Sequence, residues 1–214
     1  GRGRRRRRCG RGRYQGSPMM TVAAWVIAGY LFGSIPSGYL AVRMLLGKDI
    51  RTLGSGNIGA TNVTRFAGRK WGVAVALFDM AKGGLVVLAA RLFGVQEPLV
   101  LALAGFAGVL GHNFPLWLNF KGGKGVATSF GVIFFWNPVP ALIGGVAWYL
   151  VMKLSKYVSV GSMVSLATVP VWFVLFKGPP AYIWTSAAMA VLAVARHHTN
   201  ILRLVKREEE PIGS

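Results

Sequence analysis

The stretch PLVLALAGFAGVLGHNFPLWL, residues 98–118, contains no aspartate, glutamate, lysine or arginine. A helix needs about 20 largely apolar residues to cross roughly 30 Å of membrane hydrocarbon, so this stretch is long enough to span a bilayer. Six further stretches are candidate spans: 21–46, 71–93, 125–136, 138–153, 158–176 and 180–195. Backbone groups in lipid must be hydrogen-bonded within the chain. We therefore predict an all-α polytopic membrane helix bundle with seven transmembrane helices.

The composition excludes several other classes of protein. Of the 214 residues, 53% are hydrophobic and only 14% are charged, whereas soluble domains carry about 25% charged residues. One cysteine excludes a disulfide scaffold, and seven Trp and twelve Phe exclude an intrinsically disordered chain.

Residues 1–18, GRGRRRRRCGRGRYQGSP, contain eight arginines and supply +8 of the net charge of +19. Such a basic run can bind nucleic acid or anionic lipid, but it has no apolar face to bury. We interpret it as a polybasic extension, either disordered or not native, and predict no nucleic-acid partner. Residues 19–214 are then a single transmembrane domain.

Loop charges predict the orientation of the spans. Basic residues are concentrated in 47–70, 119–124, 154–157 and the segment after Ala195, which alternate with the almost uncharged loops 94–97, 137 and 177–179. Because positive loops face the cytoplasm, we expect the N-terminus outside and the C-terminus inside.

Only Asn137–Pro138 separates the fourth candidate span from the fifth. These two short spans form either a tight helical hairpin or one kinked helix, and the second alternative leaves six spans. Six spans would place the basic loops on both sides of the membrane, so seven is preferred.

Three polar segments fall on the predicted cytoplasmic side: GSGNIGATNVTR (54–65), HNFPLWLNFKGGKGVATS (112–129) and RHHTNILR (196–203). Glycine-rich turns expose backbone N–H groups, and a helix N-terminus beside Lys or Arg attracts anions. Together the segments indicate a site for a phosphorylated substrate. Glycines also form ordinary turns, and basic residues also mark the cytoplasmic side of a membrane protein. One segment alone is therefore weaker evidence for a substrate site than the three together.

Several familiar sites do not fit. Gly54 to Gly59 matches G-x-G-x-x-G, but no apolar strand precedes it, and Gly125 stands where a Walker A loop needs Ser or Thr. The adjacent His197 and His198 have no Cys or carboxylate cluster beside them, so we predict no metal and no cofactor. Asp79 and Lys82 have the spacing of a structural ion pair at the border of the site.

Four motifs resemble a known family: SGNIGATN (55–62), GHNFP (111–115), FKGGKGVATS (120–129) and RHHTNILRL (196–204). They resemble the bacterial acyl-phosphate-dependent glycerol-3-phosphate acyltransferases in order and separation, from about Tyr30 to the sequence EEP at 209–211. The resemblance implies a multi-pass enzyme of the bacterial inner membrane whose active site faces the cytoplasm.

The resemblance also implies the reaction. The family transfers a fatty acyl group from acyl phosphate to the 1-hydroxyl of sn-glycerol 3-phosphate, giving lysophosphatidic acid and inorganic phosphate, the first acylation of bacterial phospholipid synthesis. Neither acyl-CoA nor acyl carrier protein is the donor, and an upstream acyl-phosphate-forming enzyme is a partner to consider. The remaining alternative is an organic-phosphate transporter, for which charges near the membrane midplane and internal repeats are expected.

The candidate site residues follow from these motifs and from the chemistry. Ser55, His197 and Asn200 are the predicted catalytic residues. The predicted substrate-binding residues are Asn57, Arg65, His112, Asn113, Lys121, Gly122, Gly123, Lys124, Gly125, Thr128 and Arg196.

Roles are assigned from the needs of the reaction. Lys124, Arg65 and the glycine loop would bind the two phosphates, and Ser55 and Asn200 would donate hydrogen bonds. His197 or the departing phosphate would accept the hydroxyl proton. The acyl chain would occupy a groove between spans, open to membrane lipid.

Overall fold

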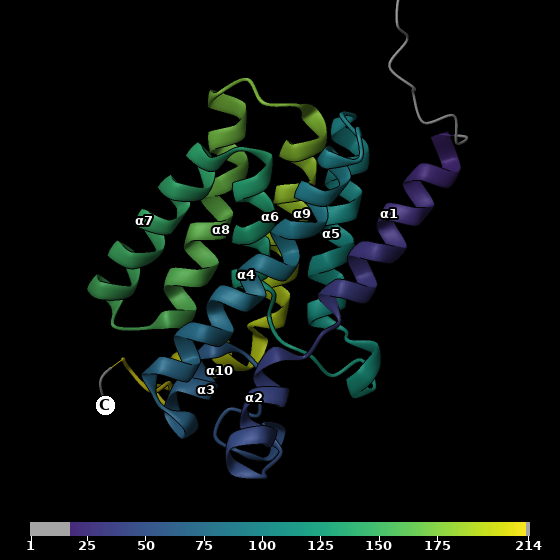
Figure 1. Cartoon of the computed structure of the whole chain (residues 1–214). Helices are drawn as coiled ribbons and strands as arrows, with labels where there is room; N and C mark the ends of the chain where they lie inside the picture. The colour runs from purple at the N-terminus through teal and green to yellow at the C-terminus, as the bar shows by residue number, and fades with distance from the viewer. Residues whose placement is uncertain (1–17, 213–214) are drawn as a thin grey trace, which may run out of the picture.

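The computed structural model describes residues 18–212, and every regular element in that range is a helix (Figure 1). The predicted extension 1–18 therefore lies outside the described residues, except for Pro18, the first residue of α1. The elements are α1 (Pro18–Gly33), α2 (Ser37–Leu46), η1 (Ile50–Thr52), α3 (Ala60–Ala67), α4 (Arg69–Leu92), α5 (Pro98–Asn113), η2 (Leu116–Leu118), α6 (Val126–Trp136), α7 (Pro138–Ser155), α8 (Val158–Leu175), α9 (Pro180–Arg196) and α10 (His198–Val205).

Five segments in the described part of the chain are long and apolar enough to cross a membrane. They are Met19–Leu46, Arg69–Leu92, Pro98–Leu118, Pro138–Ser155 and Val158–Leu175. The apolar helix α6 is shorter, with 11 residues, and α9 has 17. Each of the predicted spans thus contains a helix, although not all of these helices reach full spanning length.

The predicted span 21–46 is divided into α1 and α2 by a break at residues 34–36. Pro36 lacks a backbone N–H and disfavours helical geometry at Ile35, so the chain cannot continue as one regular helix. Ser34 donates a hydrogen bond from its hydroxyl to the Tyr30 carbonyl at 2.7 Å, which satisfies a polar group at the break.

The fourth and fifth predicted spans are separate helices, α6 and α7, joined by a tight turn at Asn137. The turn has an extended backbone at Asn137 (φ −156°, ψ 119°), and the side chain accepts a hydrogen bond from the Val139 N–H at 3.0 Å. Pro138 then begins α7, a position where a proline costs no helical hydrogen bond. The structure therefore shows the hairpin rather than one kinked helix.

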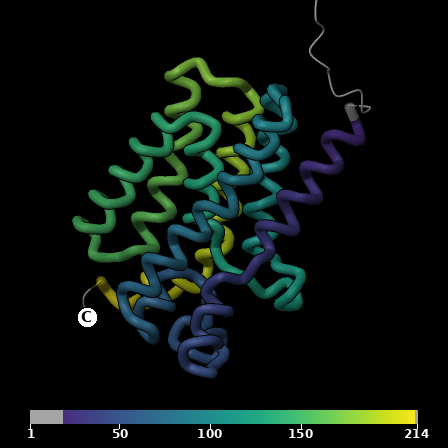
Figure 2. Tube along the Cα trace, viewed as in Figure 1, coloured from purple at the N-terminus to yellow at the C-terminus, as the bar shows by residue number. Residues whose placement is uncertain are grey.

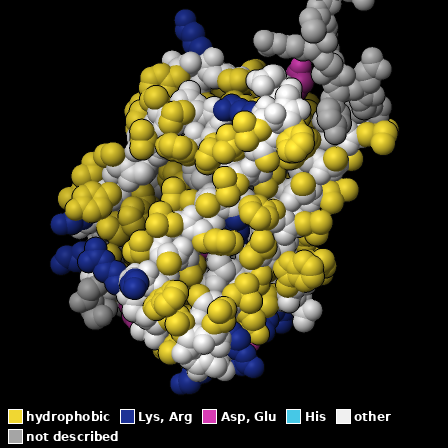
Figure 3. All heavy atoms as spheres, in the orientation of Figure 1, with side chains coloured by type: hydrophobic (Ala, Val, Ile, Leu, Met, Phe, Trp, Pro, Cys, Tyr) yellow, Lys and Arg dark blue, Asp and Glu magenta, His cyan; other side chains and the backbone are white. Residues whose placement is uncertain are grey.

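The polar connections gather at one end of the bundle. In Figures 1 and 2, α2, α3 and α10 lie together at the lower end, and α1 begins at the opposite end of the bundle. Hydrophobic side chains cover most of the face visible in Figure 3, while Lys and Arg gather mainly at its lower end. This arrangement is typical of a protein whose middle lies in hydrocarbon.

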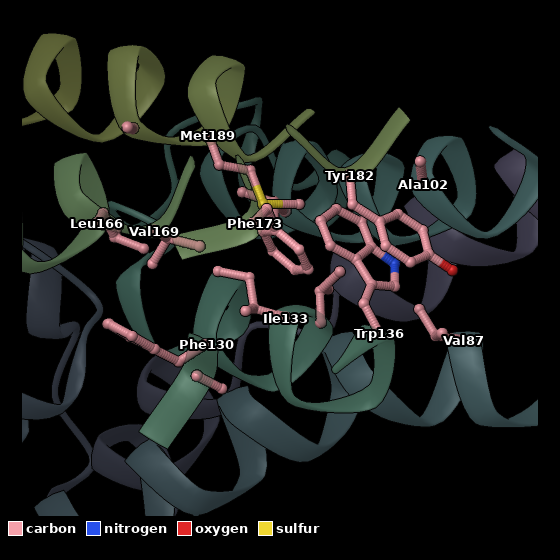
Figure 4. Close-up of a cluster of buried hydrophobic side chains, with 14 of the residues drawn as sticks. Val87, Ala102, Phe130, Ile133, Trp136, Leu166, Val169, Phe173, Tyr182 and Met189 are labelled. Carbon is pink, nitrogen blue, oxygen red and sulfur yellow. The ribbon is translucent and has the colours of Figure 1, made fainter. Parts of the chain in front are cut away.

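The main hydrophobic core lies where α6 meets α8 and α9 (Figure 4). Trp136 stacks on Tyr182 with ring centroids 4.7 Å apart, and Phe173 contacts both rings. Trp136 also donates its indole N–H to the Leu101 carbonyl at 3.2 Å. This aromatic cluster fixes the short helix α6 against its longer neighbours.

A buried ion pair joins the broken first span to α4. The Lys82 ammonium lies 2.8 Å from Asp79 Oδ1 and donates to the Ile35 carbonyl at 2.7 Å. Ser37 donates its hydroxyl to the same Asp79 oxygen at 2.6 Å. The pair predicted from its i, i+3 spacing is therefore present, and it satisfies polar groups that the helix break exposes.

Removing one member of this pair should destabilise the fold strongly. We expect Lys82→Met to lower the free energy of unfolding by about 3–5 kcal/mol, because Asp79 would keep a buried charge without its partner. The double variant Asp79→Leu/Lys82→Met should recover much of the loss. Thermal unfolding of the detergent-purified protein measures both effects.

A control on the same helix is Lys70→Met, since Lys70 is exposed. It should change stability by less than about 0.5 kcal/mol. Equal effects of Lys70→Met and Lys82→Met would contradict the role given to the buried pair.

Candidate functional site

A cavity of about 2020 Å³ opens at the polar end of the bundle and continues between α4, α6, α7 and α8. All three predicted polar segments contribute to its wall. The predicted site residues that line it are Ser55, Asn57, Arg65, His112, Lys124, Gly125, His197 and Asn200.

Asn62 holds the first polar segment in shape. Its side-chain amide donates to the carbonyls of Leu53 and Asn57, both at 3.0 Å, and its Oδ1 accepts from the Ser55 N–H at 3.3 Å. The loop 54–59 therefore folds around one buried asparagine before α3 begins. Arg65 lies in the last turn of α3 and lines the cavity.

The glycine loop of the second segment is tied to the end of α5. The Gly122 N–H donates to the Asn113 carbonyl at 3.2 Å, and the Gly123 N–H donates to the His112 carbonyl at 3.0 Å. A Cβ on Gly123 would lie 2.0 Å from the His112 ring, so no larger residue fits there. These two N–H groups therefore anchor the loop and do not point to a ligand.

The part of this segment with the geometry of an anion site is instead the start of α6. Gly125 has a left-handed backbone (φ 78°) and precedes the first turn of α6, whose residues Val126 and Ala127 line the cavity. The first N–H groups of a helix lack partners within the helix and carry its positive dipole end. Lys124 adds a full charge beside them.

The third segment supplies a hydrogen-bonded chain that reaches Lys124. The Lys124 ammonium donates to Asn200 Oδ1, and Asn200 Nδ2 donates to Glu209 Oε1 at 2.5 Å. Arg203 pairs with the other Glu209 oxygen at 3.0 Å. Residues distant in sequence thus form one network at the cavity wall.

Burial changes the protonation of two groups in this network. It lowers the pKa of the Lys124 ammonium to about 8, although the Glu209 carboxylate opposes the shift. Burial, followed by the charge of Lys124, lowers the pKa of His197 to about 4. His197 is therefore neutral at pH 7. Its Nδ1 lies 2.7 Å from the Ala193 carbonyl, which only accepts, so Nδ1 carries the hydrogen and Nε2 is the free acceptor.

The remaining predicted residues lie outside the cavity wall. Asn113 and Thr128 are buried, whereas Lys121 is exposed on the loop. Gly122 and Gly123 pack on the end of α5, and Arg196 donates to their carbonyls at 3.0 and 3.1 Å. Arg196 thus supports the glycine loop from outside the cavity.

Sequence reasoning missed the acidic residues at the C-terminus. Glu208, Glu209 and Glu210 all line the cavity, and Glu210 pairs with Arg65 at 2.9 Å. The chain has only six acidic residues, and three of them are consecutive here. That concentration was the available signal, but the sequence did not show which cations the carboxylates would meet.

Between α4, α6 and α7 the cavity is mostly apolar. Its walls there include Met80 of α4, Phe130 and Phe134 of α6, and Leu142 and Val146 of α7. The lining residues of α7 extend from Ala141 to Met152, or about 16 Å at 1.5 Å per residue. The cavity therefore joins a charged end to a long, mostly apolar groove.

Comparison with known proteins identifies the family. Residues 23–207 match the family model described as glycerol-3-phosphate acyltransferase. The chain belongs to this family. It is 47% identical over 188 residues to the glycerol-3-phosphate acyltransferase of Myxococcus xanthus, covering 87% of this chain and 97% of that protein. It is 42% identical to the enzyme of Desulforamulus reducens, covering 91% and 96%.

Solved structures agree with this assignment. The structure resembles the crystal structure of PlsY (YgiH), an integral membrane glycerol 3-phosphate acyltransferase, in its glycerol 3-phosphate form, with a TM-score of 0.84 and 38% identity over 90% of this chain and 96% of that chain. The lysophosphatidic acid form of PlsY gives a TM-score of 0.82. The family predicted from the motifs is confirmed, and the chain is an integral membrane acyltransferase.

Glu210 should compete with anions for Arg65. We expect Glu210→Gln to tighten the binding of inorganic phosphate by about two- to fivefold, the range for an exposed ion pair. Isothermal titration of the detergent-purified protein measures the dissociation constant.

The matched control is Glu208→Gln, which removes the same charge from the same segment. Glu208 lines the cavity but forms no ion pair within 4.0 Å in the described structure. If both variants tightened phosphate binding equally, the effect would come from net charge and not from release of Arg65.

Proposed function

We propose that this chain transfers a fatty acyl group from acyl phosphate to the 1-hydroxyl of sn-glycerol 3-phosphate. The products are lysophosphatidic acid and inorganic phosphate, and the reaction is the first acylation of bacterial phospholipid synthesis. The observation that carries the proposal is the single cavity that joins Lys124 and Arg65 to an apolar groove. Both substrates are anions and one also carries a long hydrocarbon chain, so they need both parts.

The acceptor and product have support from a relative. PlsY, 36–38% identical to this chain, has been solved in glycerol 3-phosphate and lysophosphatidic acid forms. In this chain, Lys124 and Arg65 would bind phosphate oxygens, assisted by the first turn of α6. Ser55 and Asn200 would donate hydrogen bonds to substrate oxygens.

The reaction needs no covalent enzyme intermediate. The 1-hydroxyl oxygen attacks the acyl carbonyl carbon, and the bond from that carbon to the phosphate oxygen breaks as the new ester forms. The hydroxyl proton passes to His197 Nε2 or to the departing phosphate. Positioning of the two anions and stabilisation of the developing oxyanion then supply the catalysis.

The groove matches the hydrocarbon part of the donor. A lipid acyl chain fills about half of the roughly 30 Å bilayer hydrocarbon, and the groove extends about 16 Å along α7. Acyl phosphate suits this arrangement because its chain enters the groove while its phosphate reaches Lys124. Acyl-CoA or an acylated acyl carrier protein, used as the donor, would need room for a much larger headgroup than phosphate.

The proposal includes a membrane topology. Seven transmembrane helices would place the N-terminus outside and the C-terminus in the cytoplasm, with the active site facing the cytoplasm of a bacterial inner membrane. The grouping of the polar segments at the basic end of the bundle supports this orientation (Figures 1 and 3). An upstream enzyme that forms acyl phosphate would supply the donor on that side.

The activity has a direct test. The purified protein, given palmitoyl phosphate and glycerol 3-phosphate, should release inorganic phosphate and form lysophosphatidic acid. Palmitoyl-CoA should give no product. Product from palmitoyl-CoA alone would overturn the donor assignment, and glycerol 3-phosphate flux into liposomes without acylation would favour a transporter.

Two substitutions should separate binding from turnover. Lys124→Ala should raise KM for glycerol 3-phosphate by about 10- to 100-fold, since a charged hydrogen bond to phosphate is lost. Asn200→Ala should instead lower kcat by about 100-fold, the effect of losing a donor to a developing oxyanion. Steady-state kinetics distinguish the two, and unchanged kinetics in both variants would remove the proposed site.

The pKa of Lys124, about 8, predicts the alkaline limb of the pH profile. Lys124 is charged below this pH and neutral above it, so anion binding should weaken as the pH rises past 8. The limb should appear in kcat/KM, which reports the free enzyme. Lys124→Arg keeps its charge and should shift the limb upward; an unchanged limb would assign it to another group.

A further inference from the structure

Helix α7 contains the pair Gly144–Gly145, and only the first has a packing explanation. A Cβ on Gly144 would lie 2.8 Å from the Phe130 ring, so a larger residue would force α7 away from α6. A Cβ on Gly145 would meet no atom within 4 Å. Glycine is the least favourable helix residue after proline, and contacts among the described residues do not require it at 145.

Gly145 lies on the face of α7 that forms the apolar groove. Leu142, Val146 and Tyr149 line the same groove from α7, while Phe130 and Phe134 line it from α6. The space left by the missing side chain at 145 is therefore part of the groove.

The position of Gly145 along the groove is also defined. It is seven residues from Met152, the α7 lining residue nearest the connection to α8, or about 10 Å at 1.5 Å per residue. The polar end lies on that side, because the Ile212 N–H donates to the Lys156 carbonyl at 2.8 Å and carries the acidic segment there. An acyl chain from the polar end reaches Gly145 only when it extends past the middle of the groove.

We propose that Gly145 keeps the outer half of the groove open and so determines which acyl-chain lengths the enzyme accepts. The inference rests on the proposed function, since it assigns the groove to the acyl chain. A palmitoyl chain fills about 15 Å of hydrocarbon and must pass Gly145. An octanoyl chain has half as many carbons and ends before it.

The test is the chain-length preference of Gly145→Leu. The ratio of kcat/KM for palmitoyl phosphate to that for octanoyl phosphate should fall by about tenfold or more relative to the wild type, because an obstructed apolar pocket discriminates in this range. The rate with octanoyl phosphate should stay near the wild-type rate. An unchanged ratio in a variant of normal thermal stability overturns the proposal.

The matched control is Leu154→Phe, which adds bulk to an exposed position of α7 outside the groove. It should leave the ratio unchanged, and an equal fall in both variants overturns the proposal. Gly145→Ala adds one methyl group and should lower the ratio by a smaller amount in the same direction. If Gly145→Leu does not fold, the ratio measured for Gly145→Ala tests the proposal.

A binding measurement separates this inference from the proposed reaction. Trp148 lines the cavity, so the part of the tryptophan fluorescence change that is lost in Trp148→Phe should report binding of palmitoyl and octanoyl lysophosphatidic acids without turnover. Weaker binding of only the palmitoyl ligand to Gly145→Leu supports the groove assignment even if the wild type transfers no acyl group from acyl phosphate. Equal weakening of both ligands overturns it.

Discussion

The carboxylate of Asp79 is the interaction on which the arrangement of the site depends. It accepts from Ser37 and pairs with Lys82, and Lys82 donates to the Ile35 carbonyl in the break between α1 and α2. A broken helix in lipid must have its free backbone groups satisfied by other parts of the protein. The ion pair does this, and it thereby permits α2 to leave the direction of α1 at the polar end.

The Asp79 carboxylate also lies close to His112, the residue that holds the glycine loop. Asp79 Oδ1 lies 3.5 Å from His112 Nδ1, and the His112 carbonyl accepts the N–H of Gly123. The other side of the loop is fixed by Arg196, whose guanidinium also lies 5.1 Å from the centre of the Phe114 ring. Lys124 therefore extends from a loop that is held on both sides, which reduces the ordering required when an anion binds.

Much of the fold could be predicted from the sequence, because apolar length and loop charge are local properties. The helical hairpin at Asn137 and the pair Asp79–Lys82 also depend on residues close in sequence. The partners of Gly122 and Gly123 could not be predicted, since a glycine turn permits several directions for its N–H groups. Likewise, the contact between Glu210 and Arg65 joins residues far apart in the chain, and only the folded bundle brings them together.

The two cations of the site, Lys124 and Arg65, lie in different environments. Lys124 is partly buried and needs a neutralising partner, because burying an unpaired charge is costly, whereas Arg65 is exposed. Glu209 is mostly buried and lies near Lys124, to which Asn200 links it. Glu210 is exposed and pairs with Arg65. A buried partner with two fixed contacts positions Asn200, and an exposed partner can exchange with water or a ligand at little cost.

The apolar groove begins where this charged network ends, so the reacting carbonyl of a bound acyl phosphate would lie at the boundary between them. The charged end is lined by ionisable side chains, whereas the groove is lined mainly by apolar ones. In the proposed acyl-phosphate donor, the hydrocarbon chain would favour the groove and the phosphate would favour the charged end, and these two preferences together would fix the position of the carbonyl group between them. Orientation of this kind supplies catalysis without a nucleophilic side chain, which explains how the cavity would support acyl transfer with no covalent enzyme intermediate.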